Sequence, residues 1–141
     1  MKELNKNAII IVVIIMVCVG VFFGYEYVTE PKIVNGALSK SINEKGKPIQ
    51  ITSNFSHEAT VYFSAKRNRF WVNKAKVVWY KGEIAIENRL LVDEEVIVNE
   101  GKYFTSQLSV PDGLEEGLYS VTIYVDGKDI RETSAQFEVK R

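Results

Sequence analysis

Hydrophobic and polar residues alternate along most of the chain after residue 48. Every second residue is apolar in segments 48–52, 59–65 and 119–125, a pattern typical of strands that bury one face. Shorter runs of the same kind lie at 76–80, 83–87, 96–98, 103–110 and 135–139. Turn residues separate these runs, and Asp126-Gly127 is a hairpin signal. The pattern predicts an all-β fold, an antiparallel sandwich of seven to eight strands, with a small closed barrel as the alternative.

The N-terminal part has a different pattern, a continuous apolar run. Residues 8–24 read AIIIVVIIMVCVGVFFG and carry no charge. As a helix, residues 8–28 would span about 31 Å, close to the roughly 30 Å of a bilayer core. A helix packed on a soluble domain would show a polar face, which this run lacks. We therefore predict a single N-terminal transmembrane helix, with candidates for an interfacial aromatic belt at Phe22, Phe23, Tyr25 and Tyr27.

Two processing alternatives for this run stay open. A cleaved signal peptide needs small residues just before the cleavage point, and Phe22-Phe23-Gly24-Tyr25-Glu26-Tyr27 is a poor match. A lipoprotein signal would place a small residue before the cysteine, whereas Val17 precedes Cys18. An uncleaved signal anchor fits best, and Lys2 and Lys6 then favour a cytoplasmic N-terminus.

These features divide the chain into four parts. We predict a cytoplasmic N-terminus at residues 1–7, a transmembrane signal anchor at 8–28, a polar linker at 29–36 and a β-sandwich domain at 37–141. The predicted localisation is the cell membrane, single-pass, with the C-terminal domain extracytoplasmic.

Charge and cysteine content exclude several classes of protein. The 141 residues include 18 Lys+Arg and 18 Asp+Glu. A neutral chain is a poor match for duplex DNA, so we expect no nucleic-acid partner. Cys18 is the only cysteine, which excludes an intrachain disulfide and a Cys/His zinc site.

The residues that catalysis would require are sparse. His57 is the only histidine, and no GxSxG motif surrounds a serine. The densest acidic cluster, Asp93-Glu94-Glu95, is interpreted as a solvated turn, with a weak calcium site as the alternative. We expect no catalytic, cofactor-binding or metal-binding residues, no cofactor and no enzymatic activity. An enzyme with an unrecognised site around His57 is the less favoured hypothesis.

The C-terminal part resembles a known type of sandwich. LSVPDGLEEGLYSVTIYVDG, followed by FEV, is similar to the last strands of immunoglobulin-like and fibronectin type III-like domains. The resemblance implies that Tyr119 is a corner tyrosine at the start of the penultimate strand and that Trp79 is the core tryptophan of the third. The run from residue 37 onward also resembles sandwich domains of bacterial membrane-anchored cell-envelope proteins. No activity follows from this resemblance.

Positive charge and aromatic residues gather in KRNRFWVNKAKVVWYKG, residues 66–82. Residues 66–92 hold seven basic and two acidic residues, whereas 93–132 hold three basic and ten acidic ones. We predict that VVWYKG is a central strand with Val77 and Trp79 inward. The candidates for binding an anionic lipid or wall polymer are Arg67, Arg69, Phe70, Trp71, Lys74 and Lys76. The alternative is a loop whose charges keep a strand edge soluble.

The combined reading is a membrane-anchored, extracytoplasmic, immunoglobulin-like domain that acts in binding or assembly at the cell envelope. Its expected partners are the membrane, through the anchor, and another envelope protein or an anionic lipid or wall polymer. The alternative function is a regulatory or sensor subunit that pairs with another membrane protein through its anchor. Gly20 and Gly24, four residues apart, are the candidate packing face for such a pairing.

Overall fold

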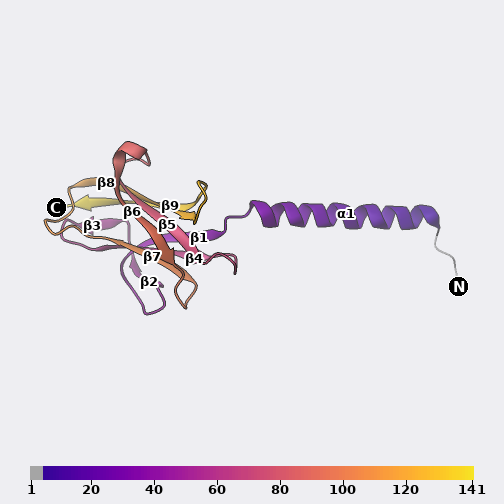
Figure 1. Cartoon of the computed structure of the whole chain (residues 1–141), viewed down its shortest axis with the longest axis horizontal. Coiled ribbons are helices and arrows are strands. Elements are labelled where there is room, and N and C mark those ends of the chain that lie inside the picture. The colour runs from indigo at the N-terminus through magenta and orange to yellow at the C-terminus, as the bar shows by residue number, and fades with distance from the viewer. Residues whose placement is uncertain (1–4) are drawn as a thin grey trace. The chain divides into compact units, whose positions relative to one another are not determined.

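The computed structural model describes residues 5–141 and divides the chain into two units. The first extends to Glu30 and contains helix α1 (Lys6–Thr29); the second, Pro31–Arg141, contains all the strands (Figure 1). Lys2, which contributed to the predicted orientation, lies outside the described residues, as does the side chain of Tyr27.

Helix α1 is apolar around its whole circumference. Every side chain described between Lys6 and Tyr25 is exposed, and this segment is long and apolar enough to cross a membrane. An N-terminal signal sequence can meet the same criterion of length and composition. Phe22, Phe23 and Tyr25 are exposed at 60–69%.

The second unit is built from nine strands and one short 3-10 helix. They are β1 (Ile33–Ile42), β2 (Pro48–Ile51), β3 (Asn54–Ser56), β4 (Val61–Arg67), β5 (Lys74–Lys81), η1 (Ile86–Asn88), β6 (Arg89–Ile97), β7 (Tyr103–Leu108), β8 (Gly117–Val125) and β9 (Arg131–Lys140).

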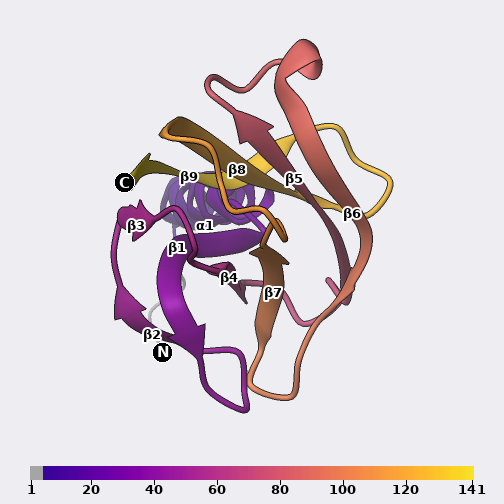
Figure 2. The ribbon, with the colours of Figure 1, turned by 90° about the vertical axis from the view of Figure 1, so that its left-hand side faces the viewer.

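The strands form two sheets that face each other in a sandwich-like arrangement. One has the order β2-β1-β4-β7 and the other β3-β9-β8-β5-β6 (Figure 2). All neighbouring pairs are antiparallel except β3 with β9, which is parallel. Neither sheet closes on itself, so the closed barrel considered from the sequence does not form.

Alternating apolar residues fill the space between the sheets, as the sequence pattern predicted. Trp79 in β5 is fully buried, and its ring lies edge-on to Phe63 of β4, with centroids 6.4 Å apart, and to Phe137 of β9, at 6.1 Å. Val77 is fully buried as well. VVWYKG is therefore a central strand with Val77 and Trp79 inward, as expected.

A polar chain crosses this core where the two sheets approach each other. The indole Nε1–H of Trp79 donates a hydrogen bond to Ser106 Oγ of β7 at 3.0 Å, and the Ser106 hydroxyl donates to Asp93 Oδ2 of β6 at 3.1 Å. Ser106 is only 6% exposed. The chain therefore satisfies a buried indole donor that would otherwise lack a partner.

Three segments differ from the sequence-based expectation. Residues 93–95 lie in strand β6 and not in a turn. The run 83–87 is not a strand, because 83–85 form a loop and 86–87 belong to η1. Residues 33–36, assigned to the linker, already belong to β1. Ile33 is fully buried in the core, so burial favours an extended strand there despite the polar residues around it.

Candidate functional site

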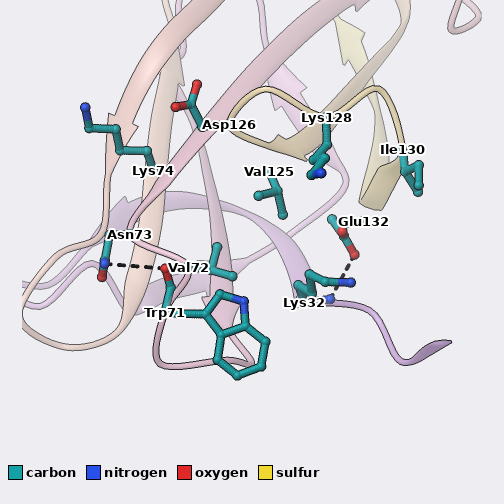
Figure 3. Close-up of a pocket in the computed structure, with 10 residues that line it drawn as sticks. All are labelled: Lys32, Trp71, Val72, Asn73, Lys74, Val125, Asp126, Lys128, Ile130 and Glu132. Atoms are coloured by element: carbon teal, nitrogen blue, oxygen red, sulfur yellow. Dashed lines mark hydrogen bonds between the residues drawn. The ribbon is translucent and has the colours of Figure 1, made fainter. Parts of the chain in front are cut away.

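A groove of about 560 Å³ opens at one end of the strands. Val72 and Val125 lie in its middle, with Trp71 and Asn73 on one side and Lys128, Glu132 and Lys32 on the other (Figure 3). Lys74, Asp126 and Ile130 complete the lining. The volume is within the range of ligand pockets, roughly 300–1,000 Å³.

Two loops and the start of the domain form the groove. The loop between β4 and β5 is fixed to the start of the domain, because the Asn68 amide side chain donates to the Pro31 carbonyl at 2.8 Å and the Asn68 backbone N–H donates to the Lys32 carbonyl at 2.9 Å. The β8–β9 hairpin is joined to β5 by the Asp126 N–H, which donates to the Lys74 carbonyl at 3.2 Å. These hydrogen bonds hold the walls of the groove in place.

The hairpin predicted at Asp126-Gly127 forms one wall of the groove. The Lys128 N–H donates to the Val125 carbonyl at 2.9 Å and closes the turn. Gly127 has φ +74°, and a Cβ built on it would have no atom within 4 Å. The turn therefore brings Lys128 and Ile130 to the groove across from the β4–β5 loop.

The two arginines of the predicted basic patch are engaged within the protein. The Arg67 guanidinium donates to the Phe70 carbonyl at 3.3 Å and to Asn73 Oδ1 at 3.0 Å, so it braces the loop from inside. Arg69 is 9% exposed and donates to the Asn68 carbonyl at 2.9 Å. Both arginines shape the loop instead of extending from it.

The remaining four residues of the patch separate into two groups. Phe70 and Trp71 are exposed at 80% and 45%, and their rings meet edge-on with centroids 5.2 Å apart. Trp71 and Lys74 line the groove. Lys76 points elsewhere: its Nζ lies 5.1 Å from the ring centroid of Tyr124, its cross-strand neighbour.

Sequence reasoning did not include several groove residues, because they come from distant segments. Lys32 was placed in the linker, and the hairpin was identified as a turn but not as part of a site. The side chains added by the fold are Lys32, Val125, Asp126, Lys128, Ile130 and Glu132. A hairpin signal predicts that two strands pair, but it does not indicate which other loop lies beside it.

The groove carries three ammonium groups and two carboxylates. Glu132 is directed to the backbone, since its Oε2 accepts the Lys32 N–H at 2.9 Å. Among the side chains that the structure describes, no ion pair within 4 Å engages Lys32, Lys74 or Lys128. The groove therefore suits an amphipathic anion, because its middle is apolar and its lysines form no ion pair with a described side chain.

The other candidate residues do not form a chemical site in the described part of the chain. His57 is half-buried against Gly113, and its carbonyl accepts the Leu114 N–H at 2.7 Å. No group of three or more His, Cys, Asp or Glu side chains is placed to hold a metal ion among the described residues. On α1, Cys18 is exposed, and a Cβ built on Gly20 or Gly24 would have nothing within 4 Å.

Two comparisons with known proteins give no match. A scan against protein-family models finds none that matches the chain. A search of curated proteins likewise finds no match. The class that the structure itself defines is a β-sandwich-like domain preceded by an apolar helix of membrane-spanning length.

Proposed function

We propose that this chain is a single-pass membrane protein whose immunoglobulin-like domain works outside the cytoplasm, in binding or assembly at the cell envelope. The observation that carries the proposal is the exposed, apolar helix that immediately precedes a domain with an open groove. A helix without a polar face is unstable in water unless lipid or protein covers it.

Strand order supports the immunoglobulin-like part of the proposal. Taking β1, β4 and β7 as strands A, B and E, and β5, β8 and β9 as C, F and G, each set lies in one sheet in that order or its reverse. Immunoglobulin-type sandwiches divide their strands in the same way. The β6 strand then extends the sheet that contains C, F and G.

Two side chains support the same assignment. The Tyr119 hydroxyl, at the start of β8, donates to the Glu115 carbonyl four residues upstream, at 2.6 Å. This is the bond of a tyrosine corner. Trp79 is fully buried in β5, which takes the place of strand C in this assignment.

Cell fractionation combined with surface proteolysis tests the placement. We expect full-length protein with a C-terminal epitope tag to remain in membranes after alkaline carbonate washing, because an inserted helix is not displaced by high pH. Protease added to intact cells should remove the tag. Release by carbonate would contradict the anchor, and a tag digested only after cell lysis would contradict the orientation.

The alternative, a regulatory or sensor subunit, depends on α1 as a pairing surface. Gly20 and Gly24 lie about one helical turn apart, and open space surrounds both positions. If the anchor pairs with another helix, Gly20→Leu together with Gly24→Leu should reduce crosslinking within the membrane. Unchanged crosslinking would leave the groove as the better-supported contact surface.

A further inference from the structure

The two ends of the sandwich carry opposite charge. One end, here called the groove end, comprises residues 31–32, 66–74 and 125–132, which the hydrogen bonds of Asn68 and Asp126 link together. It contains seven basic and three acidic residues, a balance of +4. The far end comprises 57–60, 81–88, 109–117 and 140–141, with three basic and six acidic residues, a balance of −3.

The groove end is also where the chain enters the domain. Helix α1 ends at Thr29 and β1 begins at Ile33, so residues 30–32 alone connect them. Three residues span at most about 11 Å. If α1 crosses a membrane, the Lys32 backbone must lie within that reach of the end of the helix, whatever the domain's orientation. The loop that Asn68 joins to Pro31 and Lys32 then lies beside this point.

Exposed apolar side chains occupy the same end. Phe70 is 80% exposed, Ile130 71% and Trp71 45%. All three belong to the two loops that form the groove. Aromatic residues of this kind are enriched at membrane–water interfaces, where the ring contacts lipid and polar groups together.

We infer that the groove end docks onto the surface of the membrane that holds α1, with Phe70 and Trp71 in the interfacial layer and Lys32, Lys74 and Lys128 bound to anionic phospholipid headgroups. The inference rests on the proposed function, since it requires α1 to be inserted. The positive end then faces the lipid and the negative far end is directed away from it, the orientation that an anionic surface favours.

Quenching of tryptophan fluorescence by lipid tests this docking in the full-length protein. The chain is reconstituted into vesicles of phosphatidylcholine, or of equal parts phosphatidylcholine and phosphatidylglycerol, each containing lipid brominated near the headgroup. We expect Trp71 to be quenched, and more strongly in the anionic vesicles. Trp79 is fully buried, so the Trp71→Phe variant gives the background signal of Trp79 alone.

Charge and apolar contact are tested with separate pairs of variants. Changing Lys32, Lys74 and Lys128 to Ser should lower the docked-to-undocked ratio in anionic vesicles by about a hundredfold, at roughly fivefold per lysine. The control changes three lysines elsewhere, Lys40, Lys45 and Lys47, to Ser. Phe70→Ser should reduce quenching, whereas Ile86→Ser at the far end, an equally exposed position at 78%, should not.

The possible outcomes separate the two proposals. A chain released from vesicles by carbonate overturns the anchorage in the proposed function. A chain that is retained but has unquenched Trp71 in both vesicle types overturns lipid docking alone, and would direct attention to a protein partner for the groove. Quenching that the lysine variant and its control reduce equally also overturns the inference, because the groove lysines would then have no special part.

Discussion

The hydrogen bonds that cross the core lead to a prediction about stability. Two Ser-to-Ala changes in the same sheet should affect the free energy of unfolding differently. In Ser106→Ala, the fully buried indole N–H of Trp79 loses its acceptor, and Asp93 loses a donor. Leaving a buried donor without a partner costs about 1–3 kcal/mol. We therefore expect the free energy of unfolding to fall by that amount, although the change removes a single oxygen atom.

Ser64→Ala in β4 is the matched control. Ser64 is fully buried, and its hydroxyl has no hydrogen-bond partner among the described residues. Removing an unpaired buried hydroxyl relieves a desolvation cost of about 1 kcal/mol or more. The same Ser-to-Ala change should therefore leave stability unchanged or raise it, although Ser64 lies in the strand next to that of Ser106.

Urea unfolding of the full-length protein in detergent micelles, followed by tryptophan fluorescence, measures both changes. Trp79 reports on the core directly. For a domain of this size, each 1 kcal/mol also shifts the midpoint of thermal unfolding by about 3–8 °C. A loss in Ser106→Ala no greater than that in Ser64→Ala would refute the reasoning, and so would a loss above about 1 kcal/mol in Ser64→Ala.

Further predictions concern Tyr119 and two turn glycines, all measured by the same urea assay. Tyr119→Phe should cost about 1 kcal/mol, because the hydrogen bond to the Glu115 carbonyl is lost while the ring stays. Gly127→Ala should cost about 1–2 kcal/mol from its φ of +74° alone. Gly113→Ala should cost more, because its φ is +88° and the new methyl group would overlap the His57 imidazole; adding His57→Ala should recover part of that extra loss, and no recovery would contradict the overlap.

Strands that bury one face were the predictable part of the fold. The sequence of β8 alternates because one face of the strand packs in the core, and the structure has a strand where the alternation predicts it. The residues on that face are Tyr119, Val121, Ile123 and Val125. Only the end of strand β6 was predicted, by the short run at 96–98. The rest gives no such signal, because six of the nine residues are exposed and only Val96 is buried. Glu94 and Glu95 are charges on an edge strand, which discourage pairing with another chain, and in the sequence they resemble a solvated turn.

The candidate site was predictable only in part, for a similar reason. Phe70, Trp71 and Lys74 are adjacent in sequence, and the structure places Trp71 and Lys74 in the groove lining. Arg67 is a basic residue of the same segment, but its guanidinium donates hydrogen bonds to other residues of its own loop. The sequence shows that a basic side chain is present. Whether that side chain can bind a ligand depends on the hydrogen-bond acceptors that the folded loop places beside it.

The position of the groove favours lipid over a protein as its occupant. A protein partner could use any face of a sandwich, and nothing in such a contact requires the binding residues to lie beside the point where the chain enters. A membrane imposes that requirement, since the three-residue connection keeps the Lys32 backbone within about 11 Å of the end of α1. Exposed Phe70 and Ile130, three lysines without ion pairs in the described chain and the positive end of the domain all coincide there. Contact with an anionic membrane accounts for these features and for their position beside the chain entry, whereas a protein partner leaves that position unexplained.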